Sequence, residues 1–199
     1  MTVFFRYGAM NAGKSIQVLT VRYNYHERHQ SVHLYKPSVD TREGANLIRA
    51  RIGLEAPVDA MIKPDTDIFE LHAATVAGKG APNCILIDEA QFLTREQVVQ
   101  FCDLSDRTGI PVMAFGLRSD FRGELFPGSA ALLALADRIE ELKTICWCGK
   151  KATMNARIVD GKVALEGPQV LIGGNESYTA LCRKHWKEGI SAPPSPLQA

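Results

Sequence analysis

Glycine, lysine and serine near the start of the chain are spaced for phosphate binding. The segment Gly8-Ala9-Met10-Asn11-Ala12-Gly13-Lys14-Ser15 follows the strand-like run Val3-Phe4-Phe5 and opens a stretch with helical periodicity. In such a loop the glycines let N–H groups turn toward phosphate oxygens, and the helix adds its unpaired donors. We expect Lys14 to reach the β- and γ-phosphates of ATP and the Ser15 hydroxyl to bind Mg²⁺. The alternative is a glycine turn that only joins a strand to a helix.

Two adjacent carboxylates follow a second apolar run. The run Cys84-Ile85-Leu86-Ile87 is typical of a strand buried in a parallel sheet, and it ends at Asp88 and Glu89. In phosphate-loop proteins an aspartate at this place helps to hold Mg²⁺, and Glu89 would be placed to take a proton from a nucleophile. The pair could instead cap the next helix. The catalytic interpretation requires both motifs to meet at the carboxyl ends of the strands, where such sheets bind ligands.

Three thiols and an imidazole form two close pairs in the last third of the chain. The pairs are Cys146 with Cys148, and Cys182 with His185. This set suits a closed tetrahedral Zn²⁺ site, which would be structural because four protein ligands leave no open position for water. The alternative is a set of unliganded structural thiols.

Composition excludes several classes of function. The chain has 199 residues with 23 basic and 22 acidic side chains, a balance that does not support a long electrostatic footprint on DNA or on an anionic membrane. No apolar run approaches the roughly 20 residues of a membrane helix, and the phosphate loop begins too early to leave room for a signal peptide. We expect a cytoplasmic protein with no nucleic-acid or membrane partner, in which grouped cysteines indicate metal sooner than disulfides. The isolated Cys84 and Cys102 fall on predicted core faces, where a free thiol is more often a small buried hydrophobe than a nucleophile.

Strands and helices are expected to alternate from Val3 to Leu142. Periodicity predicts helices over residues 14–29, 65–77, 94–108 and 129–136, and strands at 3–5, 32–35, 84–87, 111–117 and 139–142. Thr94 and Gln97 fit a capping box. Residues 36–57 have no clear period and are expected to form a long mobile loop near the phosphates, or a solvated insertion. The alternation predicts an α/β fold for residues 1–143, with a mostly parallel sheet of the P-loop NTPase (RecA-like) type and helices on both faces.

The pattern changes at Lys143. Alternating segments joined at Asp160-Gly161 predict a hairpin between the two Cys/His pairs. We expect residues 144–190 to form a small zinc-binding lobe and residues 191–199, which contain several prolines, to form a disordered tail.

With these motifs placed, the chain resembles the thymidine kinases of the zinc-containing class, from the first strand to about Glu188. The segments that carry the resemblance are GAMNAGKS at 8–15, Asp88-Glu89-Ala90-Gln91-Phe92, the runs 116–126 and 141–146, and Ile172 through His185. The resemblance implies transfer of the γ-phosphoryl group of ATP to the 5′-hydroxyl of thymidine, giving dTMP and ADP in nucleoside salvage. It also implies a cytosolic homotetramer, with a dimer as the alternative, that is inhibited by dTTP.

The same resemblance implies roles for individual residues. Glu89 would be the general base for the 5′-hydroxyl, and Asp88 would assist Mg²⁺. ATP and Mg²⁺ would be bound by Gly8, Ala9, Met10, Asn11, Ala12, Gly13, Lys14, Ser15, Asp88, Glu89, Ala90 and Gln91. The nucleoside pocket would be lined by Met10, Phe92, Leu117, Phe121 and Phe126 and closed by Tyr178. A substrate-closing loop of the zinc lobe would border the thymine edge, with Gln169, Val170, Leu171, Ile172 and Gly173. The zinc ligands would be Cys146, Cys148, Cys182 and His185, and Arg42 and Arg118 are candidates for steadying transition-state charge.

Two other functions fit parts of the sequence. Asp88-Glu89-Ala90-Gln91 also resembles the box of ATPase motors and helicases in which glutamate activates water, although such motors usually bring two cores or an oligomer around nucleic acid. The last third could instead be a zinc ribbon that binds single-stranded nucleic acid through aromatic and basic side chains. Those side chains are Trp147, Lys150, Lys151, Arg183, Lys184 and Trp186.

Overall fold

The centre of the molecule is a parallel sheet. The computed structural model describes residues 2–38, 46–169 and 178–193. Six strands lie in the order β5-β2-β6-β7-β1-β8, and every pair of neighbours is parallel. They are β1 (Val3–Gly8), β2 (Val32–Pro37), β5 (Ala60–Ile62), β6 (Cys84–Ile87), β7 (Val112–Gly116) and β8 (Arg138–Leu142). The predicted α/β architecture with a mostly parallel sheet is therefore confirmed.

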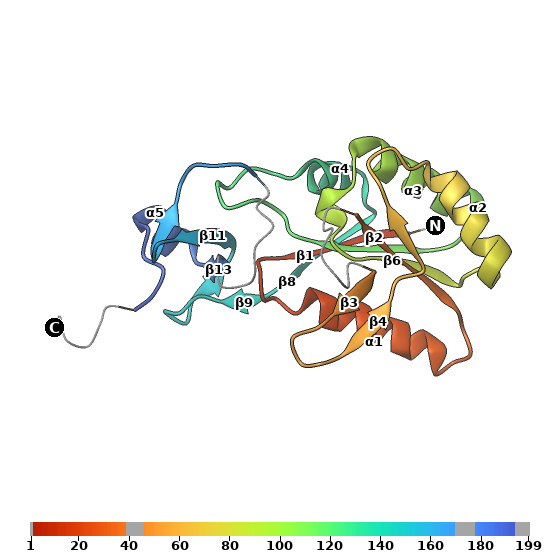
Figure 1. Cartoon of the computed structure of the whole chain (residues 1–199), viewed down its shortest axis with the longest axis horizontal. Coiled ribbons are helices and arrows are strands. Elements are labelled where there is room, and N and C mark those ends of the chain that lie inside the picture. Colours follow the sequence, from red (N-terminus) through yellow and green to blue (C-terminus); the bar gives the residue numbers. More distant parts are fainter. Residues whose placement is uncertain (1, 39–45, 170–177, 194–199) are drawn as a thin grey trace.

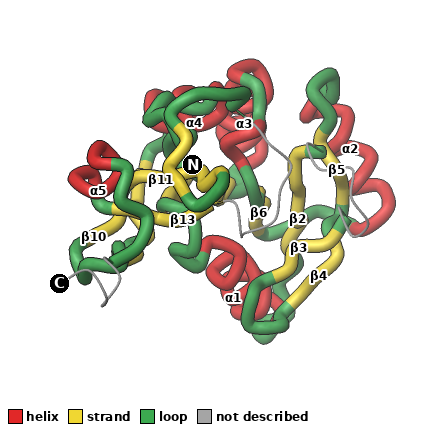
Figure 2. Tube along the Cα trace, turned by 60° about the vertical axis from the view of Figure 1, so that its left-hand side comes forward, coloured by secondary structure: helices red, strands yellow, loops and turns green. Residues whose placement is uncertain are grey.

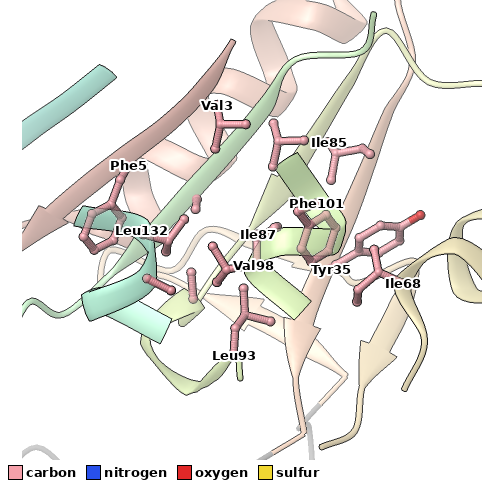
Figure 3. Close-up of a cluster of buried hydrophobic side chains, with 14 of the residues drawn as sticks. Val3, Phe5, Tyr35, Ile68, Ile85, Ile87, Leu93, Val98, Phe101 and Leu132 are labelled. Carbon is pink, nitrogen blue, oxygen red and sulfur yellow. The ribbon is translucent and has the colours of Figure 1, made fainter. Parts of the chain in front are cut away.

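Helices cover both faces of this sheet (Figures 1 and 2). On one face lies α1 (Lys14–His26), whose Val18 packs with Leu34 and Leu86. On the other face lie α2, α3 and α4, whose side chains pack against Ile85 and Ile87 of β6 (Figure 3). Their bounds are α2 (Ile68–Lys79), α3 (Arg95–Thr108) and α4 (Pro127–Leu135). Successive side chains of a strand point to opposite faces, so a strand covered on both sides is apolar throughout, as the run at residues 84–87 is.

The helix boundaries follow local capping chemistry. Thr94 Oγ1 accepts from the Gln97 N–H at 3.1 Å and Gln97 Oε1 accepts from the Thr94 N–H at 3.1 Å, which confirms the predicted capping box. The Asp67 side chain caps α2 in the same way, so this helix begins later than predicted. Helix α1 ends at His26, before the predicted position, and the chain then turns at His29 with a positive φ of 57°.

Residues 36–57, predicted to form a long mobile loop or a solvated insertion, contain strands and buried side chains in their described part, so the prediction of a loop is wrong there. Strand β2 continues to Pro37 because β5 keeps pairing with it, and residues 46–57 contain the hairpin of β3 (Leu47–Arg49) and β4 (Glu55–Pro57). Ile48, Ala50 and Ala56 are buried in the α1 layer. Three-residue strands are too short to show a period, so they gave no signal in the sequence. Residues 39–45 lie outside the described part.

A second, smaller assembly of strands lies at one end of the molecule (Figures 1 and 2). We call it the C-terminal lobe, and its elements are β9 (Thr144–Ile145), β10 (Lys151–Ala152), β11 (Met154–Val159), β12 (Lys162–Ala164), β13 (Tyr178–Leu181) and α5 (Arg183–Glu188). The antiparallel sheet has the order β12-β11-β13, and the predicted hairpin at Asp160-Gly161 is confirmed, with φ of 48° and 76°. No helix within the described residues has the length and apolar character needed to cross a membrane.

Candidate active site and metal centre

The predicted phosphate loop, residues 8–15, lies between the end of β1 and the start of α1. Gly13 precedes the helix with a φ of 79°, a left-handed conformation that glycine adopts without steric cost, and it has no side chain with which to cap the helix. The first N–H groups of α1 have no acceptor within the helix, so they can bind an anion at this end. Lys14 folds back over the loop, where its buried Nζ donates to the Ala9 carbonyl at 3.1 Å. Burial lowers the pKa of Lys14, against the opposing influence of the Glu89 and Asp88 charges.

The two sequence motifs meet at the carboxyl ends of β1 and β6. Ser15 Oγ donates to Asp88 Oδ2 at 3.4 Å, although the two residues are far apart in the sequence. Asp88 is only 3% exposed, and burial together with the neighbouring Glu89 charge raises its pKa to about 7. A hydroxyl and a buried carboxylate side by side are hard oxygen ligands of the kind that Mg²⁺ prefers. The residues present therefore fit a divalent cation.

Glu89 is held in an unusual backbone conformation at the start of a short 3₁₀ helix, η1 (Ala90–Phe92). Its φ is 54°, and its side chain makes no cap to that helix, so the capping interpretation of the acidic pair is wrong for Glu89. The Glu89 carboxylate instead accepts from Gln91 Nε2 at 2.5 Å, and Gln91 Oε1 accepts from the Leu117 N–H at 2.9 Å. Gln91 is completely buried. The carboxylate is thus fixed to the loop that follows β7.

The predicted pocket residues fall into three groups. Phe92 and Phe126 stack edge to face, with ring centroids 5.6 Å apart, beside η1. Phe121 and Tyr178 both contact the guanidinium group of Arg157. The Met10 N–H donates to Asn155 Oδ1 at 2.8 Å, which attaches the phosphate loop to the C-terminal lobe.

The remaining predicted residues are placed as follows. Asn11 is exposed with a φ of 65°, and the Ala12 N–H donates to the Ala9 carbonyl at 3.3 Å. Gln169 Nε2 donates to Asp120 Oδ2 at 3.2 Å. Arg118 lies over the Tyr7 ring and donates to the Thr153 carbonyl at 3.3 Å. The predicted residues outside the described part are Arg42, Val170, Leu171, Ile172 and Gly173.

Sequence reasoning missed several residues that hold this site together. Asn155 and Arg157 are buried polar residues at alternate positions of β11, and so they lie on one face of that strand. Asn155 joins Met10 to the Ser119 carbonyl, to which its Nδ2 donates at 2.7 Å. The one available signal was a polar side chain at every second position of an otherwise apolar strand.

The four Cys and His side chains converge in the C-terminal lobe. Cys146 Sγ and Cys182 Sγ each lie 3.5 Å from His185 Nδ1, and Cys148 Sγ lies 4.0 Å from Cys182 Sγ. In a tetrahedral site with Zn–S near 2.3 Å and Zn–N near 2.0 Å, the ligand atoms are roughly 3.5 to 3.8 Å apart. The cluster therefore has the dimensions of a Cys₃His zinc site.

The thiols of this cluster are suited to metal binding. All five cysteines are free; Cys84 is buried in the core as predicted, and Cys102 packs against the core while partly buried. Burial acts against ionisation of Cys146, but hydrogen bonds from the backbone N–H groups of Cys148 and Cys182 and from the side chains of His185 and Cys148 lower its pKa to about 6. The pKa of Cys148 is raised, against a backbone hydrogen bond at Lys150, by burial and by the neighbouring thiols. A low pKa favours the thiolate, which is the form that binds metal.

The aromatic side chains around the cluster have partners within the protein. Trp147 stacks on the His185 ring with centroids 4.1 Å apart, and its indole donates to the Ile190 carbonyl. The Trp186 indole donates to the Phe121 carbonyl at 2.8 Å, so the helix that carries His185 also holds a predicted pocket residue. These contacts occupy two of the aromatic rings on which the zinc-ribbon alternative depended.

Known proteins of one family match almost the whole chain. The family model described as thymidine kinase matches residues 1–186. The chain is 53% identical over 188 residues to a thymidine kinase of Legionella pneumophila (strain Lens), covering 94% of this chain and 90% of that protein. It is 49% identical over 193 residues to the thymidine kinase of Jannaschia sp. (strain CCS1), covering 96% and 98%. A thymidine kinase of Lactococcus lactis subsp. lactis (strain IL1403) is 50% identical over 185 residues, covering 92% and 96%.

Proposed function

This chain belongs to the thymidine kinase family, and from that premise we propose which residues transfer the γ-phosphoryl group of ATP to the 5′-hydroxyl of thymidine. The observation that carries the proposal is the contact between Ser15 and Asp88, because it brings the phosphate loop and the acidic pair to one place. Phosphoryl transfer depends mainly on in-line placement and on neutralising charge, and this place can supply both.

The phosphate loop is proposed to bind ATP. The uncapped N–H groups of α1 and the Lys14 ammonium would hold the phosphates, and Ser15 with Asp88 would hold Mg²⁺. Bound Mg²⁺ neutralises charge that develops on the phosphate oxygens. This arrangement is the basis for assigning the sheet to the P-loop NTPase type.

Glu89 is proposed to accept the proton of the 5′-hydroxyl. Its carboxylate has one oxygen engaged by Gln91, which orients the group while the side chain stays partly exposed. A general base must lie within hydrogen-bond reach of the proton that it removes. A carboxylate that is already fixed by Gln91 would lose little conformational entropy in taking that position.

The nucleoside is proposed to lie among Met10, Leu117 and the aromatic groups around Phe92, Phe121 and Tyr178. We include residues 169–173 in this pocket on the family resemblance. The Cys₃His cluster would hold structural Zn²⁺ and would fix the C-terminal lobe through Trp186. On this proposal residues 1–143 form the nucleotide-binding domain and residues 144–190 the zinc-binding domain. A cytoplasmic homotetramer with inhibition by dTTP is the assembly that the resemblance implies.

The test is a panel of nucleosides assayed for ATP-dependent monophosphate formation. We expect thymidine to be the preferred acceptor, and Glu89→Gln to lower turnover by roughly 100-fold or more while leaving ATP binding nearly intact. Glu96→Gln, at an exposed site on α3, is the matched control. ATP hydrolysis that does not depend on nucleoside would favour the motor alternative, and a Glu89→Gln enzyme with normal kcat would remove Glu89 from the mechanism.

A further inference from the structure

Arg157 is a buried arginine that contacts two predicted pocket residues, Phe121 and Tyr178. It is 3% exposed, and its guanidinium carbon lies 3.9 Å from the centre of the Phe121 ring and 5.4 Å from the centre of the Tyr178 ring. A cation over an aromatic face is attracted by the ring, and more strongly where water is excluded.

The same guanidinium binds three oxygens. Arg157 Nε donates to the Tyr178 hydroxyl at 2.9 Å, and Nη2 donates to the Pro168 carbonyl at 2.8 Å and to the Gln169 carbonyl at 3.4 Å. Arg157 therefore joins β11 to the loop after β7, to the start of β13, and to the chain that follows β12. A planar fork of donors can make these bonds at once, whereas a lysine ammonium is a single point charge that cannot reproduce them.

Gly167 provides a separate indication that the chain is fitted closely around this group. Its φ is 126°, and a Cβ atom placed on it would lie 3.1 Å from Arg157 Nη1. The guanidinium is held on its other sides by rings and carbonyls, so it has little freedom to move away. On the far side of the same loop Gln169 is attached to Asp120.

We propose that Arg157 is the positioning residue of the nucleoside pocket, which it serves by fixing Phe121, Tyr178 and the carbonyls of Pro168 and Gln169 in one arrangement. This inference rests on the proposed function, because it takes these residues to face the nucleoside. Arg157 is bound to none of the phosphate-loop residues in the described part of the chain. We therefore expect replacement of Arg157 to act mainly on nucleoside binding and to change ATP binding much less.

The test compares Arg157→Lys with the wild type in steady-state kinetics. Lysine keeps the charge and loses the fork, so we expect KM for the nucleoside to rise by roughly tenfold or more while KM for ATP stays within about twofold and kcat changes less than the nucleoside KM. Arg183→Lys, an exposed arginine on α5, is the matched control and should leave all three parameters unchanged. Zinc content and melting temperature establish that each variant is folded.

Two further variants keep the inference testable if Arg157→Lys does not fold. Tyr178→Phe removes only the hydroxyl that Arg157 binds and should raise the nucleoside KM in the same direction. Gly167→Ala should also raise the nucleoside KM. The double variant with Arg157→Lys should raise it by less than the two single variants combined, because the contact between the added Cβ and the guanidinium is then absent. An unchanged nucleoside KM in these variants, or an equal rise in KM for ATP, would overturn the inference. Failure of the proposed function would appear differently, as a wild-type enzyme that does not phosphorylate thymidine.

Discussion

Gln91 offers a sharp test of how the candidate base is oriented. Its amide donates to Glu89 at 2.5 Å and accepts from the Leu117 N–H at 2.9 Å, and the side chain is fully buried. Gln91→Glu keeps the acceptor for Leu117 but replaces the donor to Glu89 with a second carboxylate. Two carboxylates so close cannot both be ionised, so they will share a proton whose pKa lies above the usual carboxyl range.

The expected magnitude follows from the lost interaction. A hydrogen bond to a charged group contributes about 1.5 to 3 kcal/mol, and each 1.36 kcal/mol is a factor of ten in rate, so kcat at neutral pH should fall by roughly 10- to 100-fold. The shared proton also blocks the base, so activity should recover in part as the pH rises through the pKa of the pair, up to the level set by the lost hydrogen bond. Gln91→Leu, which loses both hydrogen bonds, should lower kcat without that recovery and should also lower the free energy of unfolding by roughly 2 to 4 kcal/mol.

The assay is the pH dependence of kcat for thymidine phosphorylation, with urea unfolding of each variant alongside. Gln30→Glu adds a carboxylate at an exposed position before β2, at the opposite ends of the parallel strands from Glu89, and serves as the control. If Gln91→Glu keeps the wild-type kcat and pH profile, the hydrogen bond does not orient the base, and the assignment of Glu89 loses its structural support.

Three further predictions concern the metal sites and the core. Removal of zinc by a chelator should lower the melting temperature and abolish thymidine phosphorylation, and activity should recover on adding Zn²⁺ but not Mg²⁺. A colorimetric assay measures the zinc that is released. Activity that persists once all the zinc has been released would contradict a structural role. Asp88→Asn should raise the Mg²⁺ concentration needed for half-maximal activity, because the charged ligand beside Ser15 is lost, and an unchanged Mg²⁺ titration would exclude Asp88 as a ligand. Burial lowers the pKa of both His33 and His72. Below about pH 6.5 the unfolded chain therefore binds protons at these histidines that the folded chain does not bind. Their contribution to the free energy of unfolding is fully present above that pH and is lost as the pH falls. Urea unfolding across that range should show this loss, and His72→Gln should reduce it; identical pH dependence in the variant would show that His72 is not responsible.

The sheet and its covering helices could be predicted because their signals are local. A continuous apolar run marks β1, β6 and β7, and the capping residues Thr94 and Gln97 fix where α3 begins. The Cys₃His cluster could be predicted because metal binding requires particular residue types at fixed spacing, and the same kind of pattern predicts phosphate binding at residues 8–15. Short strands such as β3 and β4 carried too few residues to show a period, and their burial depends on α1, which lies elsewhere in the sequence.

The connections between parts of the site could not be predicted from local patterns. Gln91 links Glu89 to Leu117, and Asn155 links Met10 to Ser119, through amide groups whose partners are distant in the sequence. An isolated Asn or Gln in a sequence is compatible with a surface, a turn or a buried network. Only the three-dimensional arrangement shows which of these applies.

The hydrogen bond between Met10 and Asn155 has a consequence for the order in which the protein is built. Met10 is synthesised 145 residues before Asn155, so the amide that holds the loop around Met10 is made roughly 7 to 30 seconds later at ordinary rates of synthesis. Strand β1 also lacks its pairing partners during synthesis, since both of its neighbours, β7 and β8, are synthesised much later. Nascent chains must therefore keep an apolar strand and an unfinished nucleotide site protected from aggregation until the C-terminal lobe appears.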